Sequence, residues 1–311
     1  MAKYEEVLKI FKELGGEIHN GFPAINSEVF YTKNNTPYLK SAGVVMISKP
    51  EINIDNMRKF LEGYKNGFEE YLEDPDKLTP GTQLIKTSAQ LCYMSFGPKR
   101  TKNKDARKYF DNIMSSGHGS VLEHSNYTFL FYGISRSLTH ELIRHRAGFA
   151  YSQQSQRYVS GDLIRFVERK EFQNDEKLHE LFEERIDRIK REYEEIYSIL
   201  KEKQEKEEID ILKATKDDEH IKTELRKKIN QTARAIFTNE TEAPIVVTAN
   251  IRAWRHTIEM RTDSSAETEI RELFFKVFLC LYLVEPILFE DYEIIKYKDG
   301  IYGVKTNWRK V

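Results

Sequence analysis

The stretch "PIVVTANIRAWRHTIEMRTDSSAETEIRELFFKVFLCLYLV", residues 244–284, carries most of the pattern that decides the fold. A short β-branched run opens it and predicts a strand or turn, and a helix follows from about Asn250. The polar residues TDSS predict a break in this helix, and the apolar run after them predicts a final, buried helix. The stretch therefore indicates that α and β structure meet in one core.

Segments nearer the N-terminus repeat this mixture. GVVMIS (43–48) and SNYTFLFYG (125–133) are apolar and β-branched or aromatic, which predicts strands. Helical patterns occupy residues 53–72, 86–96, 104–117 and 135–145. Strands interspersed with helices predict a mixed fold of the α+β kind.

Two segments differ from the rest in composition. Residues 1–42 begin with a short amphipathic helix and pass a turn signal at NNTP, so we interpret them as an N-terminal appendage to a main domain, 43–311. Residues 166–230 are rich in Glu, Lys and Arg, with apolar residues at helical spacing between Leu178 and Leu200. This pattern predicts a long amphipathic helix with a solvated face, and a second helix that resumes near Ile221.

The overall composition excludes several classes of protein. Lys and Arg total 49 and Asp and Glu total 50, so no global positive field draws the chain to nucleic acid or to a membrane surface. The longest apolar run, Val277–Val284, is far shorter than the roughly 20 residues that cross a bilayer. Cys92 and Cys280 both lie in apolar sequence, which predicts buried thiols in a reduced, cytoplasmic chain.

Positive charge is concentrated in "RHRAGFAYSQQSQRY", residues 144–158. Arg144, His145 and Arg146 follow the predicted helix, where cations complement the helix dipole by about 0.3 to 1 kcal/mol. That effect alone would explain the three residues. The loop beyond them supplies hydroxyl and amide groups, and Arg157 adds a fork suited to two phosphate oxygens. Together these groups favour a phosphorylated ligand with polar rings.

The late helix and one earlier segment carry further candidate groups. Asn250, Trp254, Thr257 and Arg261 fall within roughly 40° of one line on the helix, which predicts a ligand wall or, alternatively, a surface helix with a partly covered Trp. The segment SSGHGSVLEHSNYTF offers His118, Ser120, Glu123 and His124 just ahead of a strand. Its Ser and the Glu three residues later also fit a capping box.

Other familiar motifs are missing or wrongly spaced. In THELIRH, His140 and His145 are five residues apart and point away from each other on a helix, so we reject a zinc site there. The sequence has no GxSxG, no P-loop and no GxGxxG in a strand-turn-helix context. Serine hydrolases, P-loop enzymes and the usual dinucleotide fold therefore lose their main support.

Four segments together resemble the flavin-dependent thymidylate synthases, in order and rough spacing, over about residues 43–290. They are SSGHGSVLEHSNYTF, LIRHRAGFAYSQQSQRY, TARAIF and MRTDSSAETEI. The most specific elements are RHR followed by Ser155-x-Arg-Tyr158, and the distant Arg-x-Asp-Ser that begins at Arg261. The resemblance implies an α+β fold in which an antiparallel or mixed sheet packs with long helices, and it makes 43–311 the catalytic domain.

The resemblance also implies an activity: conversion of dUMP to dTMP, with methylenetetrahydrofolate as carbon donor and NADPH as reductant through FAD. It implies a homotetramer with active sites at subunit interfaces, and no nucleic-acid, membrane or metal partner. Arg261 would be the catalytic residue, because a guanidinium beside the uracil carbonyls stabilises developing negative charge. The residues implied for FAD are His118, Ser120, Glu123, Arg144, His145, Arg146, Asn250 and His256. Those implied for dUMP are Glu141, Gln153, Ser155, Gln156, Arg157, Arg234 and Arg261.

Departures from the family pattern leave alternatives open. Eight residues, 147–154, separate RHR from Ser155, one more than is usual, and Glu141 stands where Gln is usual. Because a carboxylate near a phosphate is repulsive, Glu141 must turn away, pair with an arginine, or indicate a different ligand. One alternative is flavin-dependent methylation or hydroxymethylation at C5 of another pyrimidine nucleotide. Another is a non-enzymatic RNA-binding or scaffold protein, which the near-zero net charge disfavours.

Overall fold

The central feature of the fold is a six-stranded sheet in the order β1-β2-β5-β6-β9-β7, with antiparallel pairing throughout. The computed structural model describes residues 3–64, 66–68, 77–96, 105–159, 161–206 and 219–308. The sheet's strands are β1 (Gly16–His19), β2 (Phe22–Ile25), β5 (Gly43–Ser48), β6 (Asn126–Tyr132), β7 (Phe149–Gln153) and β9 (Ile245–Asn250). A smaller sheet, β3-β4-β8, and a hairpin, β10-β11, complete the strands described. They are β3 (Val29–Tyr31), β4 (Pro37–Leu39), β8 (Phe166–Val167), β10 (Glu293–Lys296) and β11 (Tyr302–Lys305).

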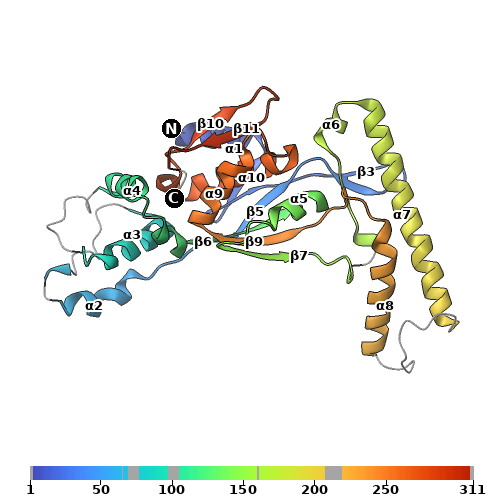
Figure 1. The fold of residues 1–311 in the computed structure, drawn as a ribbon, viewed down its shortest axis with the longest axis horizontal. Coiled ribbons are helices and arrows are strands. Elements are labelled where there is room, and N and C mark those ends of the chain that lie inside the picture. The colour runs from blue at the N-terminus through green and yellow to red at the C-terminus, as the bar shows by residue number, and fades with distance from the viewer. Residues whose placement is uncertain are drawn as a thin grey trace.

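Helices α1, α5, α9 and α10 lie along one side of the central sheet, while α7 and α8 form an arm at one end (Figure 1). The α-helices are α1 (Tyr4–Glu13), α2 (Arg58–Glu62), α3 (Pro80–Cys92), α4 (Ala106–Ser115), α5 (Arg136–Leu142), α6 (Lys170–Gln173), α7 (Glu176–Glu205), α8 (Glu219–Ala233), α9 (Ile251–Thr262) and α10 (Thr268–Val284). The short 3-10 helices are η1 (Ile54–Met57), η4 (Gly119–His124), η5 (Gly161–Leu163), η6 (Arg234–Ile236) and η7 (Pro286–Leu288). This arrangement confirms the predicted α+β fold.

The core lies between the sheet and helices α9 and α10. On β6, alternate residues from Tyr127 to Phe131 are fully buried, as the period of two in a strand requires. The indole of Trp254 packs edge-on against Phe129 and Phe149, with ring centroids 5.4 and 5.1 Å apart. Trp254 is 0% exposed, so its expected place in a ligand wall or on a partly covered surface helix is wrong. The stripe on α9 faces the sheet because α9 follows β9 directly and packs back over it.

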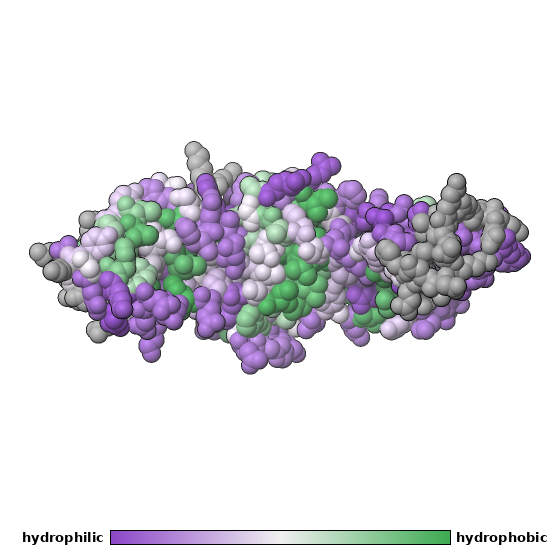
Figure 2. Space-filling view, turned by 90° about the horizontal axis from the view of Figure 1, so that it is seen from below, coloured by the Kyte–Doolittle hydropathy of each residue, from purple (hydrophilic) through white to green (hydrophobic). Residues whose placement is uncertain are grey.

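The opposite face of the sheet has no helix across its middle (Figure 1). Seen from below, apolar side chains lie across the middle of this face (Figure 2). Val45, Leu130 and Val246 form a cross-strand row there, and all three are only half-buried. Thr128 and Thr248 form the next row, with their hydroxyl oxygens 2.9 Å apart. A sheet with apolar side chains on both faces needs a second covering surface.

The N-terminal residues belong to the same sheet as the rest of the chain. β2 pairs with β5 across residue 42, and α1 packs on α10 with Val7 and Phe11 buried in the main core. The division into an appendage and a catalytic domain stays a prediction about functional units. These packing contacts show that both parts share one hydrophobic core.

Several elements differ from the sequence-based expectation. The expected helix 53–72 appears as η1 and α2 and ends at Glu62, while residues 65 and 69–76, with residue 104 of another expected helix, lie outside the described residues. β7 was expected to be part of a loop; it is a strand because β9 offers it a full antiparallel ladder. Cys280 is buried as predicted, but Cys92 is exposed at the end of α3, so that prediction is wrong. Among the described residues no helix is long and apolar enough to cross a membrane.

Candidate functional site

The RHR motif forms a turn immediately after helix α5. The hydroxyl of Ser135 caps the start of this helix, 3.1 Å from the backbone nitrogen of Leu138. The helix ends at Leu142, and backbone bonds from the nitrogens of Arg144 and His145 close the turn. The Tyr151 hydroxyl on β7 lies 2.7 Å from the carbonyl oxygen of His145 and so ties the turn to the sheet.

Arg144 and Arg146 are both exposed, and neither makes an ion pair with any residue that the structure describes. Just beyond them, Gly148 has φ +76° and lies against the side chain of Asn250. A Cβ at Gly148 would stand 2.7 Å from Nδ2 of Asn250, so only glycine fits. The turn thus presents two exposed guanidinium groups, and the chain just after it passes the N-terminus of α9, which Asn250 caps through its Oδ1.

Arg261 connects the RHR turn to α5. Its Nε donates to Nε2 of His145 at 2.8 Å, and a terminal nitrogen donates to the carboxylate of Glu141 at 3.3 Å. Burial, with smaller effects from the charges of Arg261 and His256, lowers the pKa of His145 to about 4. His145 is therefore neutral at pH 7, and because Nε2 accepts a bond, the proton is on Nδ1. Glu141 pairs with an arginine, the second of the three outcomes considered for it.

A second arginine cluster gathers around the loop after β7. The pKa of the Arg234 guanidinium is lowered first by its burial and then by the nearby charges of Arg136 and Arg157. In the described parts of the chain, none of the three arginines forms an ion pair with a carboxylate. Nε of Arg157 and Nε2 of Gln156 are buried without a hydrogen-bond partner. Unpaired buried donors next to like charges indicate a site whose acceptor is a bound anion.

The sequence reasoning missed Arg136. It occupies the first position of α5, where a cation opposes the positive end of the helix dipole. One sequence signal could have found it. It is a basic residue in the first turn of a predicted helix, two residues before the helix's apolar and polar residues begin to alternate. Its place in the cluster depends on η6, which follows α8 and brings Arg234 to the same end of α5.

A third group of predicted residues lies at η4, before β6. His118 and Ser120 are exposed, and the His118 ring stacks on Tyr93 with centroids 6.5 Å apart. Glu123 forms an ion pair with Arg252 of α9, with 2.6 Å between oxygen and nitrogen. No side chain caps η4, so the capping-box interpretation of Ser120 and Glu123 is wrong.

The structure joins the predicted residues within groups but leaves the groups apart. Arg136 and Glu141 lie at the two ends of α5. They are five positions apart in sequence, which corresponds to about 7.5 Å along the helix axis. Gln153 lies between these ends, with its Nε2 3.4 Å from the hydroxyl of Thr139. Ser155 is half-buried, and its hydroxyl accepts from the backbone nitrogen of Arg157 at 3.4 Å. A ligand that used both ends of α5 would have to be extended, with an anion at one end.

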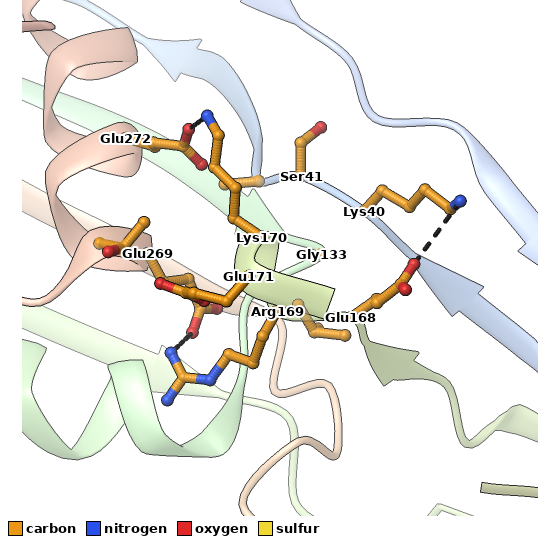
Figure 3. A pocket seen from close by; sticks show the side chains of 12 residues that line it. Lys40, Ser41, Gly133, Glu168, Arg169, Lys170, Glu171, Glu269 and Glu272 are labelled. Atoms are coloured by element: carbon orange, nitrogen blue, oxygen red, sulfur yellow. Dashed lines mark hydrogen bonds and ion pairs between the residues drawn. The ribbon is translucent and has the colours of Figure 1, made fainter. Parts of the chain in front are cut away.

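A pocket elsewhere in the chain carries charges of both signs, and most of them form ion pairs with one another (Figure 3). It lies between α6, α10 and the end of β4, and its lining includes no predicted site residue. Lys170 pairs with Glu272, Arg169 with Glu269, and Lys40 with Glu168. Because these ions are paired within the protein, the site assigned here is the arginine-rich one along α5.

The fold and the site define a mixed α+β protein with two sets of arginines that have no carboxylate partner among the described residues. The sequence profile described as "Thymidylate synthase complementing protein" matches residues 76–287. A flavin-dependent thymidylate synthase of Mycobacterium bovis is 39% identical over 220 residues, which are 71% of this chain and 83% of the relative. Proteins of the same name from Mycolicibacterium gilvum and Mycobacterium tuberculosis are 38% and 39% identical over the same shares. The chain belongs to this family, the flavin-dependent thymidylate synthases.

Proposed function

We propose that this protein converts dUMP to dTMP, with methylenetetrahydrofolate as the carbon donor and NADPH as the reductant through FAD. The observation that carries the proposal is the cluster of Arg136, Arg157 and Arg234, which has no carboxylate partner in the described residues and two buried, unpaired donors. Membership in the flavin-dependent thymidylate synthase family supports the reaction.

The arginine cluster would bind the phosphate of dUMP, because guanidinium forks match the oxygens of a phosphate. Ser155 and Gln156 would add neutral donors on the same loop, and Gln153 would lie between the phosphate and the base. Arg261 would stand by the uracil at the other end of α5. Glu141 would act on the nucleotide through Arg261, since its carboxylate is paired there and does not repel the phosphate.

Arg261 is the residue we propose as catalytic. Its guanidinium has a planar donor fork near the RHR turn. A uracil carbonyl that gains negative charge when a nucleophile adds to the ring would be stabilised by such a donor. His145 supports this role in its neutral form, because a protonated ring could not accept the bond from Nε of Arg261.

The donor set around the RHR turn fits FAD. Two exposed guanidinium groups, those of Arg144 and Arg146, suit a pyrophosphate, and the neutral His145 keeps an N–H for a ring acceptor. FAD, when bound, supplies the hydride chemistry that no side chain can provide. We propose that the following residues hold it: His118, Ser120, Glu123, Arg144, His145, Arg146, Asn250 and His256.

The direct test is the mass of the nucleotide product. We expect that purified protein, incubated with FAD, NADPH, methylenetetrahydrofolate and dUMP, forms a product heavier by one CH2 group. Reactions without the folate serve as the control, and dCMP and UMP run in parallel. If dUMP stayed unchanged while dCMP or UMP gained mass, dUMP would be ruled out as the substrate. A flavin-dependent reaction at C5 of another nucleotide would then replace it.

We propose that the functional unit is a homotetramer, with active sites at subunit interfaces and a cytoplasmic location. The half-buried apolar row on the open face of the sheet supports association (Figure 2). The separation of the η4 group from the arginine cluster also suits a site that more than one chain completes. Light scattering should give the mass of four chains, and the mass of a single chain would contradict this assembly.

A further inference from the structure

The charged helical arm, α7 and α8, reaches the proposed phosphate site through one buried amide. Asn230 lies near the end of α8 and is 1% exposed. Its Nδ2 lies 3.4 Å from the carbonyl oxygens of both Arg157 and Val159. Its Oδ1 accepts from the hydroxyl of Tyr193 on α7 at 3.3 Å. One side chain thus joins both helices of the arm to the backbone that carries Arg157.

Asparagine destabilises a buried helical position unless its side-chain hydrogen bonds compensate. It lowers helix stability by up to about 0.7 kcal/mol relative to alanine, and a buried amide costs free energy unless its donors and acceptor are satisfied. Here both amide hydrogens and the oxygen of Asn230 have partners. The two carbonyls belong to residues two apart, so the amide fixes the path of the backbone between them.

Tyr193 adds a packing contact to the same loop. Its ring is 3% exposed and stacks on Phe237 with centroids 4.9 Å apart. A Cβ at Gly161 would stand 2.3 Å from the ring, so the chain just after the loop passes directly against it. Lys227 of α8 lies over the ring of Tyr158, 5.0 Å from its centre. Asn230, Tyr193 and Lys227 of the arm therefore all contact the loop 155–159 or the residues just after it.

Arg234 directly follows the same end of α8, as the first residue of η6. It follows Asn230 by four residues, and Ala233 keeps helical angles, so the two side chains lie one turn apart on one side of the helix. Arg157 belongs to the loop that Asn230 holds, and Arg234 begins η6 directly after the helix that carries Asn230. The distance between these two guanidinium groups consequently depends on the bonds of Asn230. Like charges would otherwise push the loop and the helix apart.

We infer that Asn230, supported by Tyr193, is a positioning residue that holds Arg157 and Arg234 together for the phosphate of the nucleotide. This inference rests on the proposed function, and it assigns a task to the charged arm. The arm acts through the loop backbone and touches no reacting atom.

The test compares Asn230→Leu, Tyr193→Phe and a matched control, Gln231→Leu. Leucine has the same branched shape as asparagine, with methyl groups in place of the amide oxygen and nitrogen, and it favours a helix, so the fold should survive. Gln231 is the exposed neighbour on α8 and receives the same substitution. For each protein we would measure the dissociation constants of dUMP and of deoxyuridine, which lacks the phosphate. We would also measure amide hydrogen exchange in the ligand-free protein, in the peptide that contains Arg157 and Val159.

Asn230→Leu should weaken dUMP binding by about tenfold, which corresponds to about 1.4 kcal/mol, and leave deoxyuridine binding unchanged. Exchange in the peptide should become faster without ligand. Tyr193→Phe should cause a smaller effect of the same kind, and Gln231→Leu should match the parent. Unchanged exchange, or an equal loss of affinity for dUMP and deoxyuridine, would overturn the inference. A parent protein that did not prefer dUMP to deoxyuridine would instead overturn the phosphate site itself, before any variant is compared.

Discussion

Arg261→Ala should lower the rate of dTMP formation at saturating dUMP by about 10²- to 10³-fold, the usual loss when one positioned donor at a developing charge is removed. The fold should survive, because the Arg261 side chain is 20% exposed and packs at the surface of α9. Steady-state kinetics with the FAD-loaded enzyme would measure the effect on kcat. A fully active variant would contradict the catalytic role that we give this residue.

A spectroscopic measurement reports directly on the contact between Arg261 and His145. Arg261 is one of the charges that lower the pKa of His145 to about 4. Its removal should raise the NMR titration midpoint of His145, because a positive neighbour disfavours the imidazolium form. Met260→Ala, at an exposed position on the same helix, should leave both kcat and this midpoint as in the parent.

Arg261→Lys distinguishes charge from geometry at the same position. Lysine keeps the positive charge but has no planar fork, so it cannot donate to His145 and Glu141 in the same arrangement. We expect kcat to recover only in part. Full recovery would show that a point charge is sufficient and that the bonds to the RHR turn are dispensable.

Trp254→Ala should destabilise the protein by about 3 to 5 kcal/mol, the cost of removing a large aromatic side chain from a core. The indole is fully buried and packs against Phe129 and Phe149, and its Nε1 donates to the carbonyl of Tyr127 at 3.4 Å. Urea unfolding followed by circular dichroism would give the change in free energy of unfolding. Met260→Ala again serves as the control from α9.

The same variant decides between a core residue and a ligand wall. If Trp254 lined a ligand site, alanine would weaken ligand binding and leave the free energy of unfolding close to that of the parent. A loss of stability below about 1 kcal/mol, within the range of ordinary substitutions, would contradict the core position. Trp254→Phe should lower the free energy of unfolding by less than Trp254→Ala does, since it keeps an aromatic ring but leaves a cavity.

The RHR motif and the loop after it show which features of the site local sequence can predict. Arg144, Arg146 and Arg157 with the polar loop between them predicted an anion-binding site, since guanidinium chemistry is a property of the residue itself. The sequence did not indicate that Arg136 joins Arg157 and Arg234, because α5, the loop after β7 and η6 meet only in the folded chain. The role of Glu141 likewise depended on Arg261, which is 120 residues away in sequence.

The sequence by itself determined the mixed fold, the strands β5 and β6, the long arm helices and the family. These follow from hydrophobic periodicity and local motifs, which act over a few residues. Only the tertiary structure decided that β7 is a strand, that Trp254 faces the sheet, that Cys92 is exposed, and that Asn230 binds the arginine loop. For β7, Trp254 and Asn230 the deciding partner is distant in sequence, and the burial and hydrogen bonds that it supplies override local preference.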